Sequence, residues 1–145
     1  MLIDCPGEGK IGFASQLAIN LSDLVLVPNR TSRKARRNFY RHIYPVIKED
    51  AQKNREKYII VPTFVHPRTQ LKTLKQYFDD ILPEGINCLD SVFYSRSVYE
   101  NFEEFGLTLR EYALSVKNNK RQFVQARRAV SDMETISKEV LKLFK

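Results

Sequence analysis

The opening stretch of the chain, MLIDCPGEGK, places glycines and a lysine behind a short apolar run, as a phosphate-binding loop does. Such a loop reads G-x-x-x-x-G-K-[ST], because its amides and lysine hold the phosphates and its hydroxyl holds magnesium. Here Gly7 and Gly9 stand too close together, and Ile11 follows Lys10 in place of the hydroxyl. The sequence therefore does not predict a phosphate-binding loop at this position.

Asp4 and Cys5 are the other residues of this stretch that could do chemistry. A thiol before a helix could be acidified, but no arginine follows Cys5 at phosphatase-loop spacing, so a small buried cysteine is the preferred interpretation. An apolar strand that ends in aspartate can instead order magnesium, directly or through water. Magnesium prefers one or two carboxylates together with phosphate oxygens and water. We therefore expect Asp4 at the mouth of a parallel sheet, holding magnesium through water.

The composition indicates one domain with one core. The chain has 145 residues, 43% of them hydrophobic, and we predict a single domain over residues 1–145. No apolar run is long enough to span a membrane, and no secretory signal is recognisable, so we expect a cytoplasmic protein without a membrane partner. The formal net charge of +7 favours an acidic partner such as nucleic acid. A basic surface without such a partner is the alternative.

Short branched runs alternate with longer amphipathic ones along the chain. Thr31 or Ser32 is expected to cap the second helix, and Gly106 to close the fourth. Strands are predicted at residues 2–5, 24–28, 58–64 and 88–94. Helices are predicted at residues 11–23, about 31–56 with a kink or break at Pro45, 71–82, 97–105, and from about 120 onward. Strands separated by helices imply parallel βαβ units, whose functional residues lie beyond the carboxyl ends of the strands.

Three blocks of this pattern resemble, in order, the ParA/Soj plasmid- and chromosome-partition ATPases. The blocks are LIDCPGEGKIGFASQLAINLSDLVLVP, YIIVPTFVHPRTQL and SVFYSRSVYENFEEFGLTLREY. The third contains a G-x-x-x-x-x-Y stretch, from Gly106 to Tyr112. The order and spacing of the blocks carry the resemblance. It implies an α/β fold, a partial P-loop NTPase-like (Rossmann-like) three-layer sandwich with about four mainly parallel strands flanked by helices.

The resemblance also implies roles for particular residues. Asp4 matches the catalytic aspartate that organises magnesium and water near the γ-phosphate of ATP. Arg68 matches an arginine that contacts DNA without regard to sequence. His66 and Tyr99 depart from the family, which has an acidic and a basic residue there. Nucleotide contacts are implied at Pro62, Thr63, Tyr94 and Ser95.

The family's phosphate-binding half is missing from this sequence. ATP and Mg²⁺ are implied as cofactors, but positioning and charge neutralisation, on which phosphoryl transfer depends, come from the missing half. We therefore expect no appreciable ATPase activity from this chain alone. Residues 2–5 would lack one neighbouring strand, so we expect self-association through that edge or a partner that supplies the missing amino-terminal half.

Basic residues are concentrated at the starts of two predicted helices. Such clusters form either a solvated helix face or a set of contacts to DNA phosphates. The family resemblance favours non-specific DNA binding. The first cluster contains Arg30, Arg33, Lys34, Arg36, Arg37 and Arg41, and the second contains Lys117, Lys120, Arg121, Arg127 and Arg128.

The preferred functional hypothesis is a ParA-like partition protein that segregates DNA. It would be nucleoid-associated, and its partner would be a ParB-like centromere-binding protein. The main alternative is a non-catalytic DNA- or protein-binding regulator derived from the same fold. A third hypothesis is a septum-site protein or a metal-cluster loader. The sequence has no paired-cysteine motif, which disfavours the loader.

Overall fold

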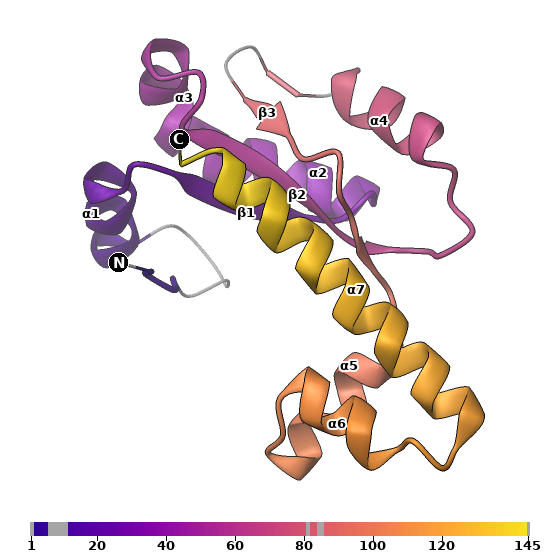
Figure 1. Cartoon of the computed structure of the whole chain (residues 1–145). Coiled ribbons are helices and arrows are strands. Elements are labelled where there is room, and N and C mark those ends of the chain that lie inside the picture. The colour runs from indigo at the N-terminus through magenta and orange to yellow at the C-terminus, as the bar shows by residue number, and fades with distance from the viewer. Residues whose placement is uncertain (1, 6–11, 81, 84–85, 145) are drawn as a thin grey trace. The chain divides into compact units, whose positions relative to one another are not determined.

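The computed structural model describes residues 2–5, 12–80, 82–83 and 86–144 (Figure 1). The fold is mixed α/β, with an open sheet of parallel strands flanked by helices, which confirms the predicted class and strand direction. Contacts divide the chain into two compact units, and each is described by itself. The first unit is Met1–Pro62 with Gln70–Cys88, and the second is Thr63–Thr69 with Leu89–Lys145. The single domain expected from the sequence stays a prediction.

The first unit is built on the central strand β2 (Tyr58–Val65), of which it contains the first part. This strand pairs in parallel with β1 (Val25–Asn29) on one side and with the short β3 (Asn87–Cys88) on the other. Ile60 is fully buried, and the neighbouring side chains of β2 are buried on both faces. A continuous apolar run is what a parallel strand covered on both faces requires.

The long helical stretch of the first unit is interrupted before Pro45, as predicted. Ser32 caps it, since its hydroxyl accepts a hydrogen bond from the amide of Ala35 at 3.1 Å. Pro45 has no amide to donate, and just before it the bonding shifts to a π pattern, with the Tyr44 amide donating to the Phe39 carbonyl. The helices are α1 (Phe13–Leu21), α2 (Arg33–Asn38), the π segment η1 (Phe39–Ile43), α3 (Tyr44–Lys53) and α4 (Leu71–Asp79).

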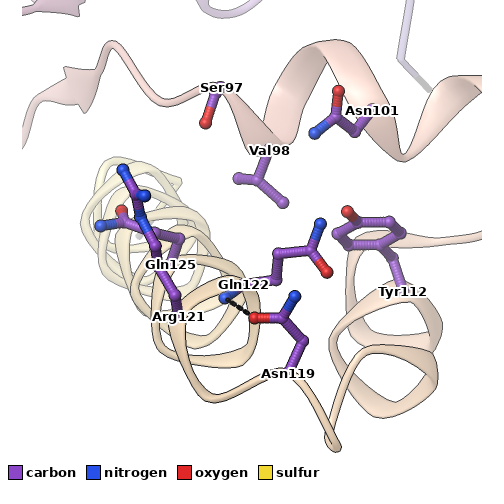
Figure 2. Close-up of a pocket in the computed structure, with 8 residues that line it drawn as sticks. All are labelled: Ser97, Val98, Asn101, Tyr112, Asn119, Arg121, Gln122 and Gln125. Carbon is purple, nitrogen blue, oxygen red and sulfur yellow. Dashed lines mark hydrogen bonds between the residues drawn. The ribbon is translucent and has the colours of Figure 1, made fainter.

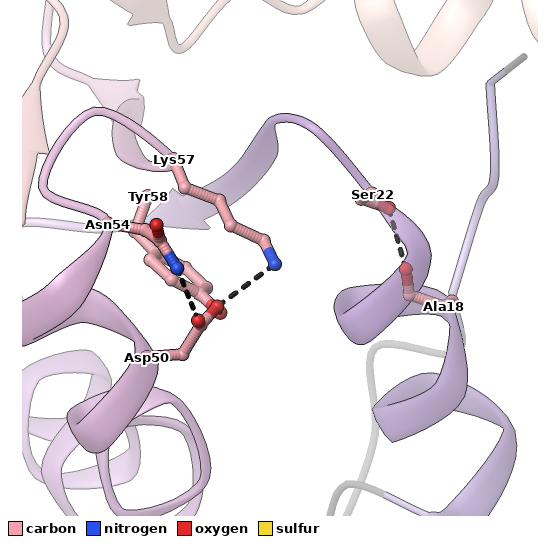
Figure 3. A network of polar contacts seen from close by, with 6 residues as sticks. All are labelled: Ala18, Ser22, Asp50, Asn54, Lys57 and Tyr58. Atoms are coloured by element: carbon pink, nitrogen blue, oxygen red, sulfur yellow. Dashed lines mark hydrogen bonds and ion pairs between the residues drawn. The ribbon is translucent and has the colours of Figure 1, made fainter.

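A polar network ties α3 to the beginning of β2 (Figure 3). The Asp50 carboxylate accepts hydrogen bonds from the Tyr58 hydroxyl at 2.5 Å and from Asn54 Nδ2 at 2.6 Å. Lys57 Nζ lies 2.9 Å from the same carboxylate. The Tyr58 hydroxyl lowers the pKa of Asp50 to about 2, with Lys57 contributing next. Burial, followed by the bond to Asp50, raises the pKa of Tyr58.

The second unit contains the end of β2 and the strand β4 (Phe93–Tyr94), which pair in parallel across a bulge. Phe64 lies in this bulge with φ 53°, a left-handed conformation that bulky residues rarely adopt. Val98, Tyr112, Ala113, Ala126 and Ala129 form the core of this unit. Its helices are α5 (Val98–Asn101), the 3₁₀ turn η2 (Glu103–Phe105), α6 (Leu109–Ser115) and α7 (Lys120–Lys142).

Capping residues mark where the helices of the second unit begin and end. Gly106 follows η2 with φ 61°, which confirms its predicted role in closing that helical segment. Thr108 and Glu111 form a capping box at the start of α6. Asn119 caps α7, since its Oδ1 accepts from the Gln122 amide at 3.2 Å.

Two strand predictions are wrong. Residues 2–5 form no strand, because no described strand pairs with them, and Leu2 is 95% exposed. The strand predicted at 88–94 is broken into β3 and β4. Between them the amides of Asp90 and Ser91 donate to the Glu139 carboxylate at 2.7 and 2.8 Å, which takes them out of any strand ladder.

Candidate nucleic-acid interface

The α2 basic surface consists of Arg33, Lys34, Arg36, Arg37 and Arg41. All of these side chains are exposed, and none forms an ion pair with a described residue. The sequence contains no aspartate or glutamate from residue 24 to residue 48. Within the described residues this surface is therefore cationic, and its contact with DNA stays a prediction.

The local helix explains why these cations face solvent. Phe39 is 2% exposed and Ala35 is half-buried, so this face of the helix is packed and the basic residues occupy the rest. Arg33 and Arg37 are four residues apart, as are Arg37 and Arg41. Like charges at this spacing destabilise a helix. An anion bound across them would remove that repulsion, which is a reason to read the surface as an interface.

Aromatic rings pack against one another on the helical stretch that carries the α2 basic surface. The ring of Tyr40 lies 5.5 Å from that of Phe39 and 5.7 Å from that of Tyr44, centroid to centroid. Partial burial raises the pKa of Tyr40, the nearby Tyr44 adds to this, and Arg36 opposes it. The rings therefore pack against one another along the same helical stretch that carries the cations.

Arg68 belongs to the second unit. It lies exposed in a turn that follows β2, where the Thr69 amide donates to the His66 carbonyl at 2.8 Å. The Arg68 amide donates to His66 Nδ1 at 3.2 Å. The guanidinium is thus presented to solvent on a short ordered turn, and its contact with DNA stays a prediction.

Of the residues expected to bind nucleotide, Pro62 and Thr63 lie within β2, Tyr94 ends β4, and Ser95 follows it. Pro62 is fully buried within β2. Thr63 lies opposite Phe93, and Tyr94 lies opposite Val65. The amide of Ser95, which is exposed, donates to the Val65 carbonyl at 2.8 Å. The structure thus places Thr63, Tyr94 and Ser95 on or just after two paired strands, while their role toward nucleotide stays a prediction.

An ion pair beside these strand ends was not found from the sequence. Arg96 donates to both carboxylate oxygens of Asp132 on α7, at 2.6 and 3.1 Å, and its guanidinium lies 5.3 Å from the Tyr94 ring centroid. Tyr99 lies close by, and burial, followed by Asp132, raises its pKa to about 12. The two residues are 36 positions apart on different elements, so no local sequence pattern predicts that they pair.

Asp4 and Cys5 do not take the positions expected of them. Both are exposed, and neither lies on a strand, so the expectation of an inner-strand carboxylate is wrong, as is that of a buried cysteine. Across the described ranges, no cluster of three or more histidine, cysteine or acidic side chains could hold a metal ion. The magnesium role of Asp4 stays a prediction, and Gly7 to Lys10 lie outside the described residues.

A pocket of about 320 Å³ lies in the second unit between α5, α6 and the beginning of α7 (Figure 2). Val98 and Tyr112 form its buried base, and the other side chains that line it are polar. Sequence reasoning did not find this pocket, because its residues come from three helices. The full lining is Ser97, Val98, Asn101, Tyr112, Asn119, Arg121, Gln122 and Gln125.

Comparison with protein-family models, with curated proteins and with solved structures finds no match for this chain. Within the described part of the chain, no helix combines the length and the apolar character needed to cross a membrane.

Proposed function

We propose that this protein binds nucleic acid through phosphate contacts made by the α2 basic surface, without reading sequence. The observation that carries the proposal is a helix whose exposed face is cationic and carries no paired carboxylate among the described residues. Arginine and lysine on a helix neutralise phosphates and release their counterions, which gives affinity independent of base sequence. The formal net charge of +7 favours the same class of partner.

The wider role that we propose is ParA-like DNA segregation, with Arg68 as a further phosphate contact. Its support is the resemblance of the sequence blocks together with parallel strands in a mixed α/β fold. On this proposal the fold is P-loop NTPase-like, Thr63, Tyr94 and Ser95 face ATP, and Asp4 serves Mg²⁺ once a partner supplies the phosphate-binding half. A ParB-like protein is the proposed centromere-binding partner.

The exposed position of Asp4, off any strand, favours a second candidate, a non-catalytic DNA-binding regulator derived from the same fold. The two candidates differ in their response to nucleotide. A segregation ATPase changes its DNA affinity when ATP and Mg²⁺ are added, whereas the regulator does not. Because the first candidate obtains its phosphate-binding half from a partner, DNA affinity is measured with and without Mg-ATP in the presence of that partner. A change in affinity on adding Mg-ATP supports the segregation ATPase, and no change supports the regulator.

The salt dependence of DNA affinity tests the α2 basic surface. The double variant Arg33→Gln/Arg37→Gln should bind duplex DNA more weakly, and the slope of log K against log salt should fall by about 0.9 for each lost phosphate contact. Lys48→Gln/Lys53→Gln on α3 removes the same charge from neighbouring exposed positions. It should leave the slope nearly unchanged, and equal losses in the two double variants would refute a specific role for the α2 basic surface.

A further inference from the structure

The first half of α7 and the loop before it, in the second unit, present a set of exposed cations. None of these side chains forms an ion pair with a described residue. The sequence contains no aspartate or glutamate from residue 112 to residue 131. The set is referred to as the α7 basic surface and consists of Lys117, Lys120, Arg121, Arg127 and Arg128.

The acidic side chains of α7 are confined to its second half, and each is engaged by another group. Asp132 and Glu134 pair with arginines of the same unit, both at 2.6 Å, and Glu139 accepts two backbone amides. The helix therefore separates charge along its length. Its carboxylates are bound within the unit, whereas the cations of its first half have no described counter-ion and attract an external anion.

The cations of α7 share one side of the helix. An α-helix has 3.6 residues per turn, so residues seven positions apart lie on the same side. Lys120 and Arg127 are related in this way, as are Arg121 and Arg128, while the opposite side packs in the core of the unit. The Arg127 guanidinium lies 5.8 Å from the centroid of the Phe123 ring, a contact that positions it and leaves its charge intact.

The neighbouring side chains indicate which class of anion fits. Val124 is the one large apolar side chain between residues 117 and 131 that is exposed, at 39%. A helix that binds a membrane surface presents Trp, Phe or Leu beside its cations, and a protein interface is rich in aromatics and poor in lysine. The exposed carboxamides of Asn118 and Gln122 instead suit phosphates and sugars, which amide side chains contact in nucleic acids.

The spacing of the cations also fits a polymer of phosphates. Seven residues of helix rise about 10 Å, close to three steps of about 3.4 Å between phosphates along one strand of a duplex. We propose that the α7 basic surface binds the backbone of duplex DNA without reading sequence, as a second surface beside that of α2. The choice of partner rests on the proposed function, but the residues are different and belong to the other unit.

The salt dependence of duplex DNA affinity, measured on the full chain, tests the α7 basic surface. Lys120→Gln/Arg128→Gln removes two exposed charges and keeps good helix formers. The variant should bind at least about 5-fold more weakly at about 100 mM salt, and the slope of log K against log salt should fall by about 0.9 for each lost phosphate contact. Unchanged affinity and slope, with an unchanged thermal midpoint, would overturn the proposal.

Two matched variants separate phosphate contact from a general effect of charge. Lys138→Gln/Lys142→Gln removes the same charge from exposed positions in the second half of α7 and should change affinity by less than about 2-fold. Equal losses in the two double variants would refute the surface. Lys120→Arg/Arg128→Lys keeps both charges and should retain the wild-type slope, because counterion release requires only the charge. A lowered slope in this variant would contradict phosphate contact.

Comparison with Arg33→Gln/Arg37→Gln distinguishes the two surfaces. If only the α7 double variant lowers the slope, the α7 basic surface stands and the role of α2 is wrong. If only the α2 double variant lowers it, the proposal for α7 is overturned and that for α2 stands. A wild-type chain that does not bind duplex DNA would refute both. Polyglutamate serves as a further probe, and weaker polyglutamate binding by the α7 variant with DNA binding retained would assign the surface to an acidic protein and overturn the proposal.

Discussion

At the scale of single residues, Asp50 shows how one carboxylate can hold a helix to a strand. It accepts hydrogen bonds from Tyr58 and Asn54 and pairs with Lys57, so a buried tyrosine of β2 is bound to a half-buried carboxylate of α3. The native pKa of Asp50 is about 2, below its ordinary value of 3.8. Because the folded state has the lower pKa, this contribution to stability is present above about pH 4 and is lost as pH falls toward about 2.

Replacing Asp50 tests this linkage. Asp50→Asn should lower the free energy of unfolding at pH 7. Between about pH 4 and pH 2 the free energy of unfolding should fall less in the variant than in the wild type, because the variant has no carboxylate to protonate at this position. Urea titrations across that range measure both effects. Asp79→Asn, at an exposed position of α4, removes the same charge and should leave the acid profile in place. An acid profile identical in Asp50→Asn and wild type would contradict the linkage.

The Arg96–Asp132 pair makes a second prediction at this scale. The two side chains are only 9% and 13% exposed, so removal of either partner leaves a nearly buried charge. Asp132→Ala should destabilise the protein by about 3–5 kcal/mol, whereas Arg96→Met/Asp132→Leu should cost less than the sum of its single variants. Denaturant unfolding of the single and double variants measures the coupling, and additive effects would exclude it.

At the scale of elements, local signals predicted most of the helices and the buried parallel strands. The Ser32 cap, the interruption before Pro45 and the continuous apolar run of β2 were all readable, because each depends on residues adjacent in sequence. The break between β3 and β4 was not readable, since the carboxylate that causes it, Glu139, lies 48 or 49 residues further along the chain. The Arg96–Asp132 pair and the pocket also could not be predicted, because their residues are far apart in the sequence. The residues of the α2 basic surface are close together in the sequence, so this cluster was predicted.

Glu139 provides a test at this scale. Its two oxygens each accept a backbone amide, so Glu139→Gln replaces one acceptor with a donor that faces an amide. We expect the free energy of unfolding to fall by about 1–3 kcal/mol. Glu134→Gln on the same helix breaks only an exposed pair with Arg110 and should cost less than about 1 kcal/mol. Similar losses in both variants, measured by urea unfolding, would rule out the proposed backbone clamp.

At the scale of the whole molecule, the first unit leaves a sheet edge and an apolar helix face open. Within the described residues, β1 is paired only with β2, so the backbone groups of its other edge have no strand partner. On α1, Phe13, Leu17 and Leu21 follow one another at four-residue spacing and are 81%, 48% and 69% exposed. Parallel sheets are ordinarily covered on both faces, and open apolar edges promote association.

These exposed features predict association that depends on protein concentration. Sedimentation equilibrium should show oligomers of the wild-type chain whose population rises with concentration, because burying the α1 stripe removes apolar surface from water. Leu17→Glu/Leu21→Glu should shift the chain toward monomer. Leu114→Glu, at a leucine of α6 that is 67% exposed in the second unit, should not. A wild-type chain that stays monomeric throughout would exclude the edge and stripe as an association surface, and equal effects of the variants would show general solubilisation by charge.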